Sequence, residues 1–306
     1  MAARHLLLSA FLLQGTGCSC SAGTAEDEDG EDGGSSADGG GANTGGQGFG
    51  GGFTTGGEGT GGSTGPNCVE EAELVYLVSY ERTLYSFDPN IPGTAAYKAI
   101  GPLNCDSFGS PQSMSVDKNG IAWVFYDSGE LFRVSTLDAT CTSTDYVHPV
   151  QNDFNQLGMG FTATSEGAFE DRLYVVSPDF GLATIEFPSL EVTELNGLFG
   201  AAELTGGPDA KLFHFEAGTA RLNEVDVSSV SAAFVHQFAG LQGTQAWAFS
   251  RYAGNFYMFT SPGVGIGSTC TMYDPITNTE MQRDSNIGFT VVGAGQSICV
   301  PPPIPQ

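Results

Sequence analysis

Five pairs of short, strand-like segments, repeated along residues 67–306, predict an all-β fold of the β-propeller type. The pairs span residues 74–79 with 83–88, 121–126 with 130–135, 172–177 with 181–186, 211–216 with 221–226, and 255–260 with 270–274. The first strand of each pair has a central aromatic residue, and these residues lie 47, 51, 39 and 44 positions apart. They are Tyr76, Trp123, Tyr174, Phe213 and Tyr257. Periods near 40 to 50 residues with several short strands per unit are typical of propeller blades. We therefore expect a ring of five blades, with six as the alternative.

Every pair except the first is preceded by a short segment rich in small residues. These segments are 113–117, 159–163, 202–206 and 246–250. Small residues suit an innermost strand, because neighbouring blades crowd together at the axis of the ring. The first pair lacks such a segment, and residues 290–294 near the C-terminus supply one. We expect this C-terminal strand to complete the first blade and close the ring, which removes the exposed edges of an open sheet.

Outer strands and turns complete the predicted blades. The outer strands are expected at 96–101, 143–148, 191–196 and 232–238. Polar interruptions and the adjacent Pro149 suit a blade edge that faces solvent. Gly120 and Gly129 end polar turns between apolar runs, where a tight hairpin requires positive φ. No segment has sustained helical periodicity. Residues 67–300 are therefore predicted to form one propeller domain, followed by a Pro-rich tail at 301–306.

Residues 1–17 have the pattern of an export signal: a basic N-terminal part, an apolar run over residues 6–13 and a final stretch of small residues. The apolar run is too short to span a bilayer as a helix. Cys18 follows Gly15-Thr-Gly, and this motif resembles the lipobox of bacterial lipoproteins, in which the cysteine carries the lipid and becomes the mature N-terminus. We expect lipidation at Cys18. Simple cleavage of the signal is the alternative, and Cys20 is a competing position.

Residues 18–66 are predicted to form a disordered tether. From residue 25 onward the segment is dominated by Gly, Ser, Thr, Asp and Glu, and it has too few apolar residues to offset the entropy of ordering. A Gly-rich coil of about 40 residues has an r.m.s. reach of roughly 35 Å. The acidic cluster at 26–32 is interpreted as a solvated charge run rather than a cation site. Such a tether would hold the propeller off a membrane without fixing its orientation.

Five cysteines lie in the predicted propeller domain. In an exported protein without a C-x-x-C pair they are expected to form disulfides rather than to bind metal. Cys68 and Cys299 flank the two halves of the blade that closes the ring, so we expect them to pair. Cys105 follows the first outer strand and Cys141 precedes the second, which makes them the next pair. Cys270 is then expected to be buried and free.

The charge of the chain argues against nucleic acid as a partner. The formal net charge is −25, and the ten Lys and Arg residues are scattered rather than clustered. The same negative field favours solubility. We expect a monomer that reaches a membrane only through a lipid anchor, and we expect no cofactor.

No catalytic residue or metal ligand is predicted. The propeller domain has three histidines, and His148, His214 and His236 form no recognisable set with Ser and Asp. His214 lies between Phe213 and Phe215 in a predicted strand, so its side chain should face away from both. We expect it to be hydrogen-bonded or on the surface rather than to act as a base.

Glycoside hydrolysis needs two carboxylates at a defined separation. The acidic pairs 70–71 and 170–171 are candidates, but a sequence does not fix their separation. Trp123 and Trp247 would suit sugar stacking if exposed. Both lie in predicted strands, so we expect them to pack between blades instead.

The chain resembles uncharacterised myxobacterial-type surface lipoproteins with propeller repeats. The resemblance is carried by Gly15-Thr-Gly-Cys18, the acidic Gly-rich tether, Val116-Asp-Lys-Asn-Gly-Ile-Ala-Trp-Val124, and Ala246-Trp-Ala-Phe-Ser250 with Asn255-Phe-Tyr-Met-Phe-Thr260. Ser19, directly after the cysteine, is similar to members directed to the outer membrane. The resemblance implies an extracytoplasmic location at the outer membrane or cell surface. A secreted or periplasmic location follows if the signal is simply cleaved.

Two functions are consistent with these features. The first is a non-enzymatic binding or scaffold module that recognises a glycan or protein partner at one face of the ring. The second is an extracytoplasmic lyase or hydrolase, because residues 116–124 resemble repeats of streptogramin-lyase-like propellers. The paired catalytic histidines of that lyase are not located in this sequence. The ligand site is expected on loops 151–156, 165–171 or 261–268. The sequence does not single out individual residues within these loops.

Overall fold

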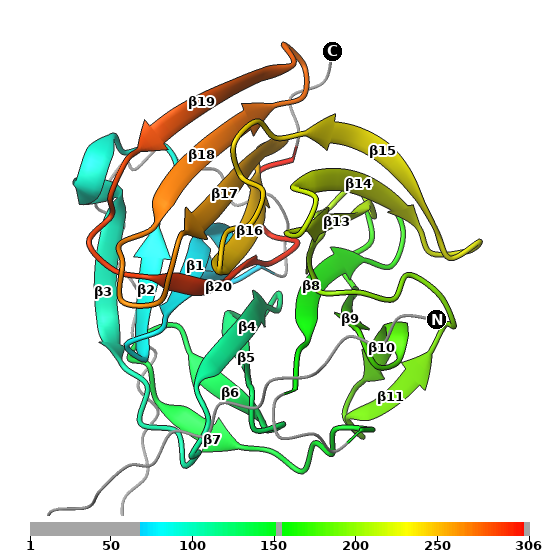
Figure 1. Cartoon of the computed structure of the whole chain (residues 1–306). Coiled ribbons are helices and arrows are strands. Elements are labelled where there is room, and N and C mark those ends of the chain that lie inside the picture. Colours follow the sequence, from blue (N-terminus) through cyan, green and yellow to red (C-terminus); the bar gives the residue numbers. More distant parts are fainter. Residues whose placement is uncertain (1–67, 151–154, 303–306) are drawn as a thin grey trace, which may run out of the picture. The chain divides into compact units, whose positions relative to one another are not determined.

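The computed structural model describes residues 68–150 and 155–302. The expected signal segment, Cys18, the tether and residues 303–306 of the tail lie outside the described residues. Twenty strands of the described chain form five four-stranded antiparallel sheets. The sheets stand around a common axis (Figure 1), so this part of the chain is a five-bladed β-propeller.

Each blade contributes one strand to the axis and three strands outward from it. From the axis outward, blade 1 contains β20 (Val291–Gln296), β1 (Val75–Ser79), β2 (Thr83–Phe87) and β3 (Tyr97–Pro102), and blade 2 contains β4 (Pro111–Val116), β5 (Ile121–Tyr126), β6 (Leu131–Ser135) and β7 (Cys141–Ser143). Blade 3 contains β8 (Gly158–Ala163), β9 (Asp171–Ser177), β10 (Gly181–Glu186) and β11 (Glu191–Glu194), and blade 4 contains β12 (Ala202–Thr205), β13 (Leu212–Glu216), β14 (Arg221–Asp226) and β15 (Ser231–Gln237). Blade 5 contains β16 (Ala246–Tyr252), β17 (Asn255–Ser261), β18 (Thr269–Asp274) and β19 (Thr279–Asp284). Two short 3-10 turns, η1 (Glu70–Glu73) and η2 (Gly93–Ala96), are the helical elements of the described residues. None of the described helices is long and apolar enough to cross a membrane.

The C-terminal strand closes the ring as the sequence predicts. β20 pairs antiparallel with β1, so the last strand of the chain becomes the innermost strand of the first blade (Figure 1). A disulfide between Cys68 and Cys299 joins the segments that flank this pair, with the Cα atoms 5.8 Å apart. A second disulfide joins Cys105, between blades 1 and 2, to Cys141 at the start of β7. These are the two pairs expected from the sequence, and Cys270 is buried and free.

Close packing at the axis explains the small residues of the innermost strands. A Cβ atom on Gly158 of β8 would lie 2.0 Å from the carbonyl oxygen of Ala202 in the next blade. A Cβ atom on Gly295 of β20 would lie 2.6 Å from Cα of Ser115 in blade 2. Neither position has space for a side chain, so the backbones of adjacent blades meet directly at these two points.

Apolar clusters between the blades form the core. Each junction between neighbouring blades has its own cluster of buried side chains in the described residues. Between blades 2 and 3 the cluster includes Trp123, which is 5% exposed, as the sequence predicts. Trp247 also packs against the cluster between blades 4 and 5, as expected, but it lies at the edge of that cluster and is only half-buried.

Two outer strands differ from the sequence-based expectation. The outer strand of blade 2 is Cys141–Ser143 rather than 143–148. The aromatic residues after it turn inward, where Tyr146 and His148 are buried against Phe125. The outer strand of blade 5, β19, was not predicted because its side chains are mostly exposed and show no apolar alternation. It forms through its hydrogen bonds to β18.

Candidate functional site

The innermost strands all begin at the same face of the ring, which we call the mouth face. In a four-stranded antiparallel blade, the connection between the second and third strands and the crossover to the next blade reach this face. Residues from these positions surround a pocket of about 140 Å³ at the mouth of the axis. The pocket is lined by Tyr80, Ser110, Pro111, Gln112, Asp127, Gln156, Gln245, Ala246, Trp247, Val264 and Val292. We call this the mouth pocket.

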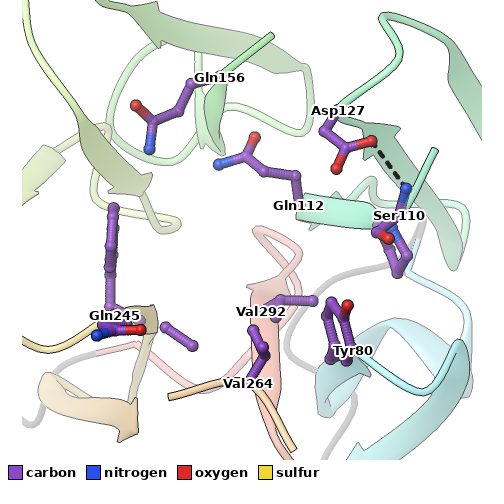
Figure 2. Close-up of a pocket in the computed structure, with 11 residues that line it drawn as sticks. Tyr80, Ser110, Gln112, Asp127, Gln156, Gln245, Val264 and Val292 are labelled. Carbon is purple, nitrogen blue, oxygen red and sulfur yellow. Dashed lines mark hydrogen bonds between the residues drawn. The ribbon is translucent and has the colours of Figure 1, made fainter. Parts of the chain in front are cut away.

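Three glutamines give the mouth pocket its polar character. Gln112 and Gln156 lie on one side of the pocket with Asp127, and Gln245 lies on the opposite side (Figure 2). Oε1 of Gln112 accepts a hydrogen bond from the backbone N–H of Leu157 at 2.9 Å, which orients the amide. Each glutamine brings one acceptor and two donor hydrogens to the wall of the pocket.

Asp127 is the one formally charged residue among the described lining residues. Its Oδ1 accepts the backbone N–H of Ser110 at 2.8 Å, the interaction dashed in Figure 2, and its own N–H donates to the carbonyl of Ser110 at 3.0 Å. The carboxylate therefore fixes the start of β4 against the turn between β5 and β6. Its role in the pocket is at least partly structural.

The apolar wall is held by the connection between β17 and β18. Oγ of Ser261 lies within hydrogen-bond distance of the carbonyl oxygens of Gly263 and Ile266, at 2.7 and 2.9 Å. Gly265 has a φ of +78°, which favours glycine. Within this braced loop Val264 is 54% exposed and reaches the mouth pocket. Together with Tyr80, Val292 and the half-buried Trp247 it gives the pocket an apolar surface that is formed before any ligand arrives.

Two buried polar side chains join all five blades at the axis. Glu203 of blade 4 accepts hydrogen bonds from Oγ of Ser113 in blade 2, at 2.8 Å, and from the backbone of Met159 in blade 3. Gln296 of blade 1 donates through Nε2 to Oγ1 of Thr205 in blade 4, at 2.8 Å, and accepts from Oγ of Ser250 in blade 5. The centre of the ring is therefore filled by a polar network rather than left as an open pore.

Glu203 is the ionisable group at the centre of this network. Its side chain is 1% exposed, and burial raises the pKa of the carboxyl well above its usual range. The hydrogen bonds from Ser113 and Met159 act in the opposite direction, but burial dominates. Burial disfavours the carboxylate, so the folded protein keeps this proton at a higher pH than the unfolded chain does.

The acidic pairs considered from the sequence do not meet in the mouth pocket. Glu70 and Glu71 lie on η1, before β1. Asp171 begins β9 and accepts the backbone N–H of Lys118 at 2.8 Å, and burial raises its pKa. Among the described residues no group of three His, Cys, Asp or Glu side chains is placed to hold a metal ion.

None of the three histidines lines the mouth pocket. Nδ1 of His148 lies 3.1 Å from the hydroxyl of Tyr146, and Nε2 of His236 lies 2.7 Å from Oε1 of Glu280. His214 faces away from Phe213 and Phe215 as expected, since its pairing partner Leu204 belongs to the cluster on the other side of the blade.

The environment of His214 differs from the expectation. The residue is 4% exposed, and neither ring nitrogen has a hydrogen-bond partner among the described residues. It is therefore neither on the surface nor hydrogen-bonded. Nδ1 lies 3.8 Å from Oε1 of Glu216, and burial lowers the pKa of the imidazole despite this carboxylate.

A larger cleft of about 710 Å³ lies between blades 2 and 3. Its aromatic wall contains Trp123 and Phe187, with ring centroids 4.7 Å apart, and the guanidinium of Arg133 lies 5.7 Å from the Trp123 centroid. Nε1 of Trp123 donates to Asp117 at 3.1 Å. Because the tryptophan is only 5% exposed, it offers little surface for a ligand to stack on.

Two of the three loops in which the ligand site is expected contribute residues to the mouth pocket. Loop 151–156 contributes Gln156 and loop 261–268 contributes Val264, whereas loop 165–171 contributes no lining residue to the mouth pocket. The sequence reasoning missed Gln112 and Gln245. Both lie immediately before a small-residue segment, and residues that precede an innermost strand must reach the mouth of the axis. That rule would have selected them.

No protein-family model matches the chain, and no curated protein is similar to it in sequence. The fold is similar to that of solved structures. A chain of a nidogen/laminin complex has a TM-score of 0.45 at 9% identity, covering 72% of this chain and 97% of that one. The extracellular domain of a hybrid two-component system from B. thetaiotaomicron has a TM-score of 0.37 at 12% identity, covering 71% and 28%. A chain of a mitotic checkpoint complex has a TM-score of 0.39 at 13% identity, covering 74% and 70%.

Proposed function

We propose that this chain is an exported, lipid-anchored β-propeller that acts as a monomeric, non-enzymatic binding module, with the mouth pocket as its ligand site. The observation that carries the binding function is the pocket itself. It combines an apolar surface with converging amide groups on a rigid ring, which is the usual composition of a ligand site.

The chemistry of the pocket supports binding over hydrolysis. A hydrolase needs an acid and a base that converge on the reacting bond. Asp127 is the one carboxylate that lines the mouth pocket in the described chain, and it already accepts a backbone hydrogen bond from Ser110. The histidines and the acidic pairs of the described chain lie elsewhere.

Two observations support an extracytoplasmic location. The described residues form two disulfides, and such bonds persist in oxidising compartments. The N-terminal sequence has an export pattern that ends at Cys18. Expression with a radiolabelled fatty acid tests the anchor. We expect label in the wild-type chain and none in Cys18→Ala, and label that persists in Cys18→Ala would refute lipidation at this residue.

Binding is tested by thermal unfolding of the soluble Cys18→Ala chain against a panel of oligosaccharides and peptides. A ligand at about 100 times its dissociation constant adds roughly 2.7 kcal/mol to the stability of the native state. We expect a reproducible increase in Tm with one class of ligand, and we expect Trp247→Ala to abolish it. A panel without any shift would count against a small-ligand site and favour a role as a spacer.

A further inference from the structure

Uncharged connections are grouped on one side of the mouth face, and carboxylates of the neighbouring strands reach two of them, where Glu216 accepts a hydrogen bond from Oγ1 of Thr219 and Glu280 accepts one from the backbone N–H of Ala239. Five successive connections reach this face between the end of β11 and the start of β20, and none of them contains Asp, Glu, Lys, Arg or His. They span residues 195–201, 217–220, 238–245, 262–268 and 285–290. Charged residues make up 15% of the chain, and its net charge is −25. Uncharged connections grouped on one side of one face therefore differ from the average composition of the chain. We call this surface the neutral rim.

The neutral rim is continuous with the mouth pocket. Gln245 ends one of its connections and Val264 lies in another, and both line the pocket. The rim also presents apolar side chains to solvent, with Phe199 at 64% and Ile266 at 51% exposure. In contrast, the wall formed by blade 2 contains the charged residue of the pocket, Asp127.

The absence of basic groups argues against an anionic ligand. No Lys, Arg or His is among the described residues that line the mouth pocket. A carboxylate, sulfate or phosphate entering the pocket would lose its hydration without gaining an opposite charge, which is costly. The overall negative field of the protein adds to this cost at long range. A cationic ligand would find one carboxylate, and Asp127 is already engaged with Ser110.

The size of the pocket argues against an extended peptide. Its volume is about 140 Å³, against about 710 Å³ for the cleft between blades 2 and 3. This space suits one ring-sized group. Peptides that bind in an extended form within a pocket need a groove several residues long.

We propose that the mouth pocket binds one sugar unit of an uncharged polysaccharide, and that the neighbouring units lie along the neutral rim. This inference rests on the proposed binding function and names the ligand class of the same site. The apolar face of the sugar packs on Trp247, and its hydroxyl groups exchange hydrogen bonds with the amides of Gln112, Gln156 and Gln245.

The test is isothermal titration of the full Cys18→Ala chain with three sets of probes. The neutral probes are maltohexaose, cellohexaose and mannohexaose. The acidic probes are hexagalacturonate and a hyaluronan hexamer, and the third set is a proline-rich decapeptide. We expect saturable binding of at least one neutral hexasaccharide and no binding of the acidic probes or the peptide.

Three variants locate the site. We expect Trp247→Ala to weaken binding by at least about tenfold, since it removes an aromatic surface of the pocket. Gln245→Glu, which keeps the shape but adds a charge, should weaken binding without lowering the Tm, so it remains informative if Trp247→Ala does not fold. Phe187→Ala is the matched control, because this exposed aromatic side chain lines the other cleft. Its affinity should be unchanged.

The outcomes separate the two proposals. Binding of an acidic probe or of the peptide that is lost in Trp247→Ala would overturn the neutral-sugar inference and retain the binding function. Binding of a neutral sugar that depends on Phe187 but not on Trp247 or Gln245 would overturn the assignment to the mouth pocket. Absence of binding to every probe would count against both.

Discussion

Replacing Glu203 with glutamine should make the protein progressively more stable than the wild type as the pH rises. The amide side chain of Glu203→Gln would keep one oxygen as a hydrogen-bond acceptor for this network, but it cannot ionise. In the wild type, burial raises the pKa of Glu203 well above its usual range. At pH values between the pKa of Glu203 in the unfolded chain and its pKa in the folded protein, the unfolded chain has lost this proton and the folded protein has kept it. The contribution of Glu203 to stability is therefore complete below the unfolded pKa and is lost as the pH rises toward the folded pKa.

The magnitude follows from proton linkage. One proton changes the free energy of unfolding by at most about 1.4 kcal/mol per pH unit. The difference in unfolding free energy between Glu203→Gln and the wild type should therefore rise with pH, from about pH 4.5 upward, by up to that slope. Below that pH the difference should be constant, because both the folded and the unfolded chains are protonated there.

Urea unfolding at pH values from about 4 to 8 measures this difference directly, with the folding free energy obtained by linear extrapolation. The m-value should stay the same in both proteins, which shows that the same surface is exposed on unfolding. Glu191→Gln is the matched control, because Glu191 lies exposed on the outer strand of blade 3, and its substitution should leave the slope unchanged. A difference between Glu203→Gln and wild type that is flat or falls with rising pH would refute the argument.

Three further predictions concern stability. His214→Leu should stabilise the protein by about 1–3 kcal/mol, because it removes a buried imidazole whose nitrogens lack hydrogen-bond partners in the described chain. Since burial lowers the pKa of this imidazole, the gain in unfolding free energy, measured with urea, should grow as the pH falls below the usual histidine range. A variant that is less stable than the wild type at every pH would contradict this. Replacing Cys68 and Cys299 with Ser should lower the unfolding free energy by about 2–4 kcal/mol under non-reducing conditions, and an unchanged urea midpoint would show that the bond does not constrain the unfolded chain. Gly158→Ala should cost about 3 kcal/mol or prevent folding, whereas Gly218→Ala, whose Cβ meets no atom within 4 Å, should be nearly neutral; equal melting temperatures would refute the close contact at the axis.

The ring could be predicted from the sequence because each blade repeats the same local pattern. Runs of apolar residues mark the second strands, and crowding at the axis favours small residues in the innermost strands. The outer strands obey neither constraint. β19 has mostly exposed side chains and lies at the blade edge through backbone hydrogen bonds, which any residue except proline can make. Its composition therefore carries little information about its conformation.

The candidate site could be predicted only to the level of loops. Trp123 and Trp247 have similar sequence contexts, each within an apolar strand. Trp123 lies on a second strand, between two blades, and is buried. Trp247 lies near the start of an innermost strand, where the blade ends and the mouth pocket begins. Position along the blade decides their exposure, and this depends on how the blades pack in three dimensions.

The filled axis has a consequence for the order in which the protein can fold. Gln296 belongs to the last strand of the chain, yet it joins residues of blades 4 and 5 to blade 1. Until that strand has been synthesised, β1 has no inner neighbour and Thr205 and Ser250 lack their shared partner. Early blades therefore cannot reach their final packing one at a time as the chain is made. Completion of the native state must wait for the C-terminal residues, and a chain truncated before β20 should remain open and prone to associate through the free edge of its first blade.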